Sequence, residues 1–398
     1  MRRKAVIFGA GNVGRGFLGQ LFSESGYEIT FVDIDESLIE ALRSRATYTI
    51  RLVDNEGTEE VHVGPVTGLL SCNADAVAAA LAGATLAATA VGARALPQIA
   101  PLVGAGIALR AQRGVASPLN IIVCENLKGA ATIFRDLVTE RLDASYHPYL
   151  ASQVGFVETV IGRMVPQPSP KLRAQDRTLI VVEPYKQLPV DHLGFVGEAP
   201  QIVGMVACDN FELYTARKLY LHNMGHAVLG YLGYRRGHAL GYKALEDPEV
   251  RPIFDGAMGE SLEGIASCYG ASREWLRAHV AELTARFANR ALADPVLRLA
   301  RDPLRKLAPS DRLVGAARLS ERAGIIPMNL AWAIAGGLAF DAPQDRIAVE
   351  LQQRIAADGV ESVLESVCEV RRDEPLGVAV LQRYRRLHQE IRWLSSTR

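Results

Sequence analysis

The sequence has no excess of charge of either sign. Its 398 residues include 44 Lys and Arg and 44 Asp and Glu. Proteins that hold nucleic acid by its phosphates present a broad positive surface. We therefore expect no nucleic-acid partner, and any site for an anion must be built from local charges.

Long apolar runs are also missing. About 18 to 20 uninterrupted apolar residues are needed to cross a bilayer, and Gly83 and Thr85 interrupt even the alanine-rich region 76–90. The first residues, MRRKAVIFGAG, offer only the apolar run AVIF, which is too short for a secretory signal. We expect no membrane segment and a cytoplasmic location.

Cysteine is scarce and scattered. The five cysteines lie at positions 72, 124, 208, 268 and 368, and none belongs to a C-x-x-C motif. This pattern predicts reduced thiols and argues against a disulfide framework or a zinc ribbon. The motifs H-E-x-x-H and G-x-S-x-G are absent as well. We expect no metal site, and surface or structural positions for the histidines 62, 147, 192, 222, 238, 279 and 388.

The composition is that of a globular protein that can bury a core, with 49% hydrophobic and 22% charged residues. The chain is too long for one ordinary core, so we expect two domains. The pattern changes near residue 200, which divides the chain into 1–200 and 201–398. We find no internal repeat that would indicate a solenoid.

Short apolar runs alternate with helical patterns in the first part of the chain. This alternation predicts a parallel sheet covered by helices. We expect strands over 4–8, 28–32, 86–91 and 120–124, and helices over 14–25 and 36–45. The stretch 146–200 is more irregular, with one strand-like run at 178–182, and we expect it at the outer part of the sheet. Long helical patterns at 210–233, 252–269 and 272–289 predict an all-α second half.

A glycine-rich turn directly follows the first predicted strand. It has the form G-x-G-x-x-G and consists of Gly9, Ala10, Gly11, Asn12, Val13 and Gly14. The first glycine permits a tight turn, the second lets a pyrophosphate approach the backbone, and the third lets the helix pack on the strand. The alternative is a turn that serves close packing only, but its position between a strand and a helix favours a dinucleotide site.

Asp33 ends the second predicted strand, where a carboxylate can accept hydrogen bonds from the adenosine ribose. The same charge repels a 2′-phosphate, so we predict NAD as the cofactor in preference to NADP. Asp33 could instead cap the next helix, a role that Asp35 could also fill. We expect the later strand ends to add cofactor-binding residues on the same edge of the sheet, namely Thr89, Val91 and Gly92.

Three polar residues interrupt the apolar helix KLYLHNMGHAVLG. At about 100° per residue, Lys218, Asn223 and His226 project within an arc of about 140°. A dehydrogenase that works without a metal needs a base for the hydroxyl proton and donors for the developing alkoxide. These side chains could supply both. They could equally be a solvated lysine and two structural hydrogen-bonding residues.

Five segments resemble the polyol-specific long-chain dehydrogenases. They are KAVIFGAGNVGRGF, NIIVCENLKGA, GFVETVIGRMVP, RKLYLHNMGHA and DPLRKLAPSDRL, and they occur in the family's order between residue 4 and about residue 340. The resemblance implies an α/β, Rossmann-type doubly wound sheet domain followed by a mainly α-helical substrate domain. It also implies enzymes that work without zinc.

The same resemblance implies roles for individual residues. Lys218 would be the general base in alcohol oxidation and the general acid in ketone reduction. Asn126 and Asn223 would form the oxyanion site, and His226 would bind substrate hydroxyls.

A basic segment matches the family's substrate-binding pair. Arg298 and Lys306 are that pair, and Arg301, Arg305 and Arg312 add charge that could hold a sugar phosphate. The alternative for this cluster is a solvated helix-turn surface.

One position departs from the family pattern. The family has V-D-R-I-x-P where this chain has I-G-R-M-V-P, so Gly162 replaces an aspartate near the substrate. The alternative carboxylate is Glu158, if the segment bends.

The resemblance thus implies an NAD-dependent, metal-independent dehydrogenase that interconverts mannitol 1-phosphate and fructose 6-phosphate. One alternative is a family member acting on a free polyol or on a hexuronate such as fructuronate or tagaturonate. Another is an NAD-binding sensor without turnover. The sequence leaves open whether the protein is a monomer or a dimer.

Overall fold

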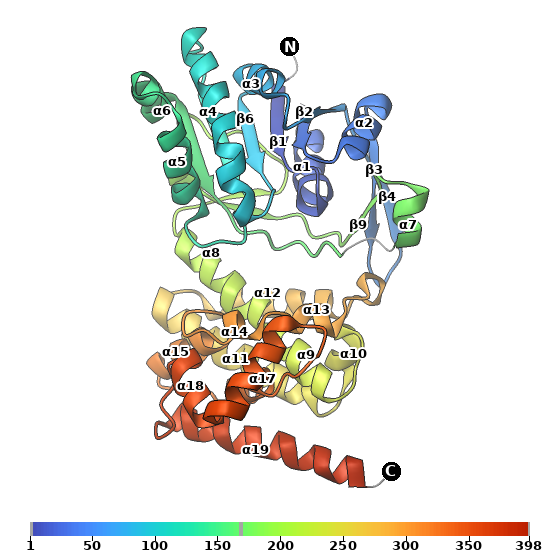
Figure 1. Cartoon of the computed structure of the whole chain (residues 1–398), viewed down its shortest axis with the longest axis vertical. Helices are drawn as coiled ribbons and strands as arrows, with labels where there is room; N and C mark the ends of the chain where they lie inside the picture. The colour runs from blue at the N-terminus through green and yellow to red at the C-terminus, as the bar shows by residue number, and fades with distance from the viewer. Residues whose placement is uncertain (1–2, 167–169, 397–398) are drawn as a thin grey trace. The chain divides into compact units, whose positions relative to one another are not determined.

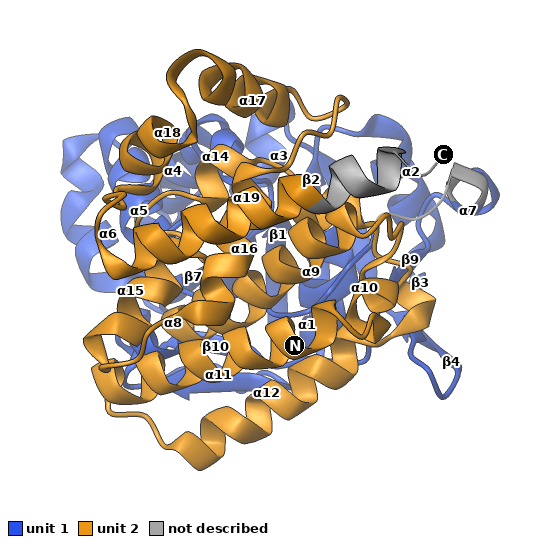
Figure 2. Cartoon of the chain, turned by 90° about the horizontal axis from the view of Figure 1, so that it is seen from below, with its two compact units in different colours: residues 1–214 blue, residues 215–398 orange. Residues whose placement is uncertain are grey.

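The structure is a computed structural model that describes residues 3–166 and 170–396. The chain forms two compact units, Met1–Tyr214 and Thr215–Arg398, which Figure 2 distinguishes by colour. The first unit contains the sheets, and the second is helical.

Six parallel strands form the main sheet of the first unit, in the order β5-β2-β1-β6-β7-β8. Figure 1 labels β1, β2 and β6 of this sheet. The strands are β1 (Arg3–Phe8), β2 (Tyr27–Asp33), β5 (Val66–Leu70), β6 (Leu86–Thr89), β7 (Leu119–Val123) and β8 (Val154–Glu158). The order reverses on either side of β1, as in doubly wound dinucleotide-binding folds. The predicted α/β fold is therefore confirmed.

Helices cover both faces of this sheet because successive strand residues point to opposite sides. Ala5 and Ile7 pack with α1 (Gly19–Glu24) and α2 (Glu36–Arg45). Val6 and Phe8 belong to the other core, with α3 (Ala74–Ala82), α4 (Leu96–Gln112) and α5 (Ala130–Arg141). All four of these strand residues are at most 1% exposed, so β1 fixes the position of the glycine turn that follows it.

Two smaller sheets extend the first unit. One contains β4 (Thr58–Val63), β3 (Tyr48–Val53) and β9 (Ile180–Val182), and the other contains β10 (Leu188–Asp191) and β11 (Met205–Cys208). The expectation for 146–200 is thus only partly right. Strand β8 does lie at the edge of the main sheet, but β9 pairs with β3 in a separate sheet.

The second unit is built around the helix predicted at 210–233. This segment forms α8 (Phe211–Arg217), the π-helical turn η5 (Lys218–Asn223) and α9 (Met224–Arg235). Helix α9 packs against α10 (Gly241–Glu246), α11 (Val250–Tyr269), α13 (Val296–Ala300) and α16 (Met328–Leu338). The predicted helix at 272–289 is α12 (Arg273–Phe287). Within the described residues, no helix is long and apolar enough to span a membrane.

Candidate functional site

The glycine turn after β1 has the geometry of a tight crossing. Gly9 has φ of +97°, and its N–H donates to the carbonyl of Val32 at 2.8 Å. A Cβ on Gly14 would lie 1.9 Å from the Gly9 oxygen, whereas a Cβ on Gly11 would meet no protein atom within 4 Å. Gly9 and Gly14 are therefore required by the fold, while Gly11 leaves the backbone open on the side where a pyrophosphate would bind.

Asp33 ties the end of β2 to this turn. Its Oδ2 accepts from the Ala10 amide at 2.6 Å, and its Oδ1 accepts from the amides of Ile34 and Asp35 at 2.8 and 3.0 Å. Asp35, in contrast, caps α2 by accepting from the Leu38 amide at 3.1 Å. The capping role considered for Asp33 is thus filled by Asp35, and the Asp33 carboxylate lies beside the glycine turn.

Arg15 stabilises the glycine turn through its side chain, a role that was not predicted from the sequence. Its side chain is 6% exposed, and it donates to the carbonyls of Ala10 and Thr178 at 2.5 Å each. Residues Gly14–Leu18 form the π-helical turn η1. The Tyr48 hydroxyl donates to the Arg15 carbonyl at 2.7 Å, so the first turn of the helix is held by the Tyr48 side chain and by the Thr178 carbonyl.

A buried carboxylate connects the ends of β6 and β7. Glu125 is 7% exposed, and its Oε1 accepts from the Val91 amide at 3.0 Å. Burial raises the pKa of Glu125, and the hydrogen bond from the Val91 amide opposes that rise. Sequence reasoning selected Thr89, Val91 and Gly92 but missed Glu125, whose only signal is its place next to Asn126. The Asn126 side chain is exposed at this strand end.

Two residues bear on the position where this chain lacks the family's aspartate, Glu158 and Gly162. Glu158 accepts from the amides of Ala130 and Ala131 at 3.1 and 2.7 Å, so it caps α5. It is therefore not available to replace the missing aspartate. A Cβ on Gly162 would lie 3.1 Å from the Tyr185 ring, so a larger side chain would require the ring to shift.

In the second unit, Lys218 and Asn223 begin and end the π-helical turn η5. The value of 100° per residue does not apply across this turn, so the arc calculated from the sequence does not describe it. Lys218, Asn223 and His226 are all partly buried. Single π-helical turns within α-helices are rare and frequently occur at functional sites.

Two histidines of the same helix, His222 and His226, contact the ring of Phe287 at the end of α12. The rings of His222 and His226 have centroids 4.8 Å apart, and the Phe287 ring lies 5.6 and 4.3 Å from them. Burial and nearby positive charges hold the pKa of both histidines well below their usual value. His222 was expected only at the surface or in a structural contact, yet it lies between Lys218 and His226 in sequence and contacts the second.

Three of the predicted basic residues, Arg298, Lys306 and Arg312, act on the pKa of His226. Burial is the largest cause that lowers the pKa of His226, and the positive charges of Arg298, Arg286, Arg312 and Lys306 lower it further. Helix α13, which carries Arg298, approaches α9 closely, because a Cβ on Gly230 would lie 2.7 Å from the Ala300 nitrogen. Arg286 was not selected from the sequence.

Lys306 is a buried lysine within this basic segment. It is 4% exposed, and its Nζ donates to the carbonyls of Leu299, at 2.8 Å, and Arg301. Burial lowers its pKa to about 7, helped by Arg312, Arg305 and Arg301 and opposed by Asp302. A cation buried in this way, beside other cations, can be stabilised by a bound anion.

Each of three arginines also has a carboxylate partner. The pairs are Arg298 with Asp294, Arg305 with Asp302 at 2.9 Å, and Arg312 with Asp311 at 2.7 Å. The side chain of Arg312 is 9% exposed, whereas Arg305 is 47% exposed. The alternative of a solvated surface therefore suits Arg305 better than Arg312.

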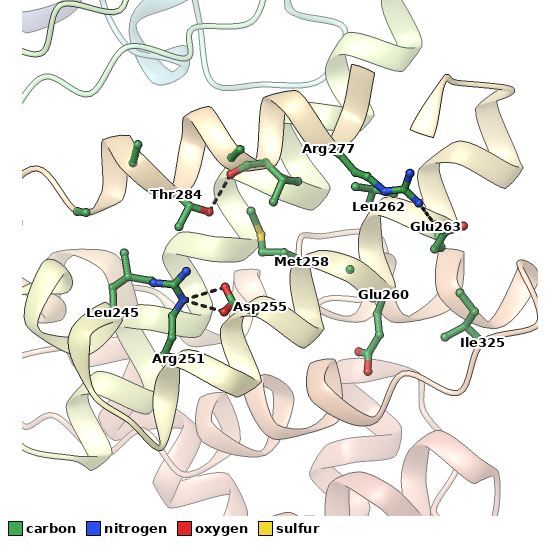
Figure 3. A pocket seen from close by; sticks show the side chains of 15 residues that line it. Leu245, Arg251, Asp255, Met258, Glu260, Leu262, Glu263, Arg277, Thr284 and Ile325 are labelled. Carbon is green, nitrogen blue, oxygen red and sulfur yellow. Dashed lines mark hydrogen bonds and ion pairs between the residues drawn. The ribbon is translucent and has the colours of Figure 1, made fainter. Parts of the chain in front are cut away.

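A separate apolar groove of about 930 Å³ lies along α11 and α12. Figure 3 shows Met258 and Leu262 in it, with the pair Arg251 and Asp255 at one end. None of the sequence-predicted site residues lines this groove. Across the described residues, no group of three or more His, Cys, Asp or Glu side chains could hold a metal ion.

Comparisons with known proteins cover nearly the whole chain. Residues 3–204 match the family model of the mannitol dehydrogenase Rossmann domain, and residues 210–388 match that of the mannitol dehydrogenase C-terminal domain. Mannitol-1-phosphate 5-dehydrogenase of Bacillus pumilus is 36% identical over 95% of this chain and 99% of its own length. The enzyme of the same name from Brevibacillus brevis is 37% identical over 96% of this chain and 98% of its own.

Solved structures agree on the fold. Mannitol 2-dehydrogenase of Pseudomonas fluorescens, in a ternary complex with NAD and D-mannitol, matches with a TM-score of 0.75 at 19% identity, over 98% of this chain and 92% of that one. A D-sorbitol dehydrogenase in substrate-free form matches with a TM-score of 0.72 at 16% identity, over 96% of this chain and 95% of that one.

Proposed function

The chain belongs to the mannitol dehydrogenase family, and we propose that it is an NAD-dependent dehydrogenase that interconverts D-mannitol 1-phosphate and D-fructose 6-phosphate. The relatives with that activity in their name match it over nearly their whole length. The observation that carries the proposal is the pair of buried basic side chains, Lys306 and Arg312, whose charges lower the pKa of His226 on the helix of Lys218 and Asn223.

The first unit fits NAD. Gly11 leaves its backbone open, and Asp33 places a carboxylate at the end of β2, where it favours ribose hydroxyls and disfavours a 2′-phosphate. When bound, NAD would supply the hydride acceptor for oxidation of the alcohol carbon, and its reduced form the hydride for reduction of the ketone. We assign Thr89, Val91 and Gly92, at the end of β6, to the same cofactor site.

Lys218 moves the proton. Its amine takes the proton of the alcohol during oxidation and returns it to the carbonyl oxygen during reduction. A lysine can do this where burial and neighbouring cations disfavour its charged form. Asn223 donates a hydrogen bond to the oxygen as it gains negative charge, and His226 holds a neighbouring substrate hydroxyl. We assign Asn126 to the oxyanion role from its match to the family's asparagine at this strand end.

The phosphate is bound by the basic segment. Lys306 and Arg312 are its most buried members and lie near His226, together with Arg298. Arg301 and Arg305 surround Lys306 and add positive charge. A phosphate receives strong charge-assisted hydrogen bonds from such groups. We also propose a cytoplasmic location, which the five free cysteines support.

The test is to incubate the purified protein with NADH and follow nicotinamide absorbance with three substrates. We expect kcat/KM for fructose 6-phosphate to exceed that for fructose by at least about a hundredfold, as two charge-assisted hydrogen bonds would give. The acidic partners of Arg298, Arg305 and Arg312 already neutralise these side chains, which favours the rival of a free, uncharged polyol substrate; a hexuronate is a further rival. Turnover of fructose or fructuronate without turnover of fructose 6-phosphate would establish that rival. NADH binding without any turnover would identify a sensor.

A further inference from the structure

Residues 176–178 are bound by side-chain interactions to the segments around the glycine turn, β2 and α2. Arg45 pairs with Asp176 at 2.8 Å, Arg177 donates to both carboxylate oxygens of Asp35 at 3.0 and 2.8 Å, and Arg15 donates to the Thr178 carbonyl. Arg15 also holds the glycine turn. The segment is therefore positioned by the same residues that shape the nucleotide site.

Arg177 lies at the turn that follows β2. This turn is compact because Asp33 accepts from the amides of Ile34 and Asp35. The Asp35 carboxylate, which binds Arg177, is thus two residues from the carboxylate expected to contact the ribose. The Arg177 side chain is 55% exposed, so its guanidinium is accessible to a ligand.

The charges at this turn decide which ribose it accepts. A 2′-hydroxyl can donate to Asp33, whereas a 2′-phosphate would be repelled by Asp33 and attracted by Arg177. Asp35 neutralises Arg177 in the native protein, so the two carboxylates outweigh the single guanidinium. The balance favours a cofactor without the phosphate.

We propose that Arg177 is a cofactor-selecting residue that receives a 2′-phosphate once the charge of Asp33 is removed. The inference rests on the nucleotide site of the proposed function, but not on its sugar substrate. Arg177 comes from a segment far from the glycine turn in sequence. It is therefore a second determinant of the choice between NAD and NADP, separate from Asp33.

The test measures binding of adenosine 2′,5′-bisphosphate and of 5′-AMP by calorimetry, without any sugar. The proteins are the wild type, Asp33→Asn, Arg177→Ala and the double variant. Asparagine keeps an acceptor for one of the amides that Asp33 binds. Arg45→Ala is the matched control, because it removes the neighbouring ion pair to Asp176 and leaves Arg177 in place.

We expect Asp33→Asn to bind the bisphosphate about tenfold or more tightly than the wild type does, and Arg177→Ala to remove that gain in the double variant. Affinity for 5′-AMP and NADH should change little on removal of Arg177, and Arg45→Ala should leave the gain intact. A gain that persists without Arg177, or that is lost equally in Arg45→Ala, would overturn the proposal.

Two further results separate folding from selectivity. If Asp33→Asn loses NADH binding, Asp33→Ser takes its place. If that variant also loses NADH binding, the proposal is tested by comparing the wild type with Arg177→Ala at low salt. The affinity for adenosine 2′,5′-bisphosphate must then fall when Arg177 is replaced. Absence of any gain in an Asp33 variant that still binds NADH would contradict the inference. Failure to reduce fructose 6-phosphate would leave these nucleotide results unaffected and would count only against the proposed reaction.

Discussion

The imidazole rings of His222 and His226 lie edge to face, with centroids 4.8 Å apart and an interplanar angle of 77°. Both rings also contact Phe287. Burial keeps both histidines neutral among several cations. We conclude that His222 and Phe287 hold the ring of His226 in one orientation.

Removing His222 should therefore affect substrate binding through His226. We expect His222→Ala to lower stability by about 2 to 4 kcal/mol and to raise KM for fructose 6-phosphate about tenfold. His222→Phe keeps a ring in the stack and should restore most of both losses. Urea denaturation and steady-state kinetics measure the two effects. The exposed His62→Ala is the control, and equal KM values in all four proteins would refute this role.

Substitutions of two glycines in the nucleotide turn should affect different properties, NADH affinity for Gly11 and stability for Gly14. Gly11→Ala meets no protein atom within 4 Å, so it should leave the melting temperature unchanged while NADH affinity falls at least about tenfold. Gly14→Ala would clash with the Gly9 carbonyl and should cost about 1 to 3 kcal/mol of stability. Calorimetry with NADH and thermal unfolding distinguish them. Tight NADH binding by Gly11→Ala would show that no pyrophosphate lies against this residue.

Lys306 should impose a pH dependence on phosphate binding. Its pKa in the folded protein is about 7, so the side chain is charged below pH 7 and loses its charge as pH rises through that value. KM for fructose 6-phosphate should rise over the same range. Lys306→Arg keeps the charge and should flatten the profile. The substrate's own phosphate ionisation affects both proteins alike, so the ratio of the two KM values isolates Lys306, and a constant ratio from pH 6 to about pH 8 would contradict the assignment.

Asp247 allows a prediction about the stability of the protein that does not involve the proposed active site. Burial raises its pKa, but hydrogen bonds from His238, from the Glu249 and Val250 amides and from Arg236 outweigh burial and lower it to about 2. Because the folded pKa lies below the unfolded one of about 3.9, this stabilisation is present above pH 4 and is lost as pH falls towards 2.

Asp247→Asn should accordingly reduce the free energy of unfolding by about 1 to 2 kcal/mol at pH 7 and leave KM unchanged. The difference between variant and wild type should shrink in acid. Urea denaturation at several pH values checks this. A difference that stays constant down to pH 2 would count against the charge of Asp247 as its source.

Local patterns in the sequence were sufficient for the nucleotide-binding half of the main sheet. Strand β1, the glycine turn and α2 depend on neighbours within a few residues, and the structure has all three where they were predicted. The sheet of β4, β3 and β9 was not predicted, because β9 pairs with a strand more than a hundred residues earlier. A short apolar run such as Ile180–Val182 does not specify such a distant partner.

The candidate site shows the same division. Lys218, Asn223 and His226 were selected as candidates because they are polar residues in an apolar helix, but the π-helical turn from Lys218 to Asn223 has no signal in residue spacing. His222 and Arg286 were missed because their place near His226 depends on how α9 and α12 pack. Arg177 was missed for a similar reason, since its partner Asp35 lies far away in sequence.

The most direct test of the account compares wild type and Lys218→Ala in one pair of measurements, NADH oxidation with fructose 6-phosphate and NADH binding. We predict that the variant loses turnover at least about a thousandfold, as expected for removal of an acid-base group, and binds NADH as the wild type does. Turnover within about tenfold of the wild type would contradict the assignment of Lys218 as the group that moves the proton.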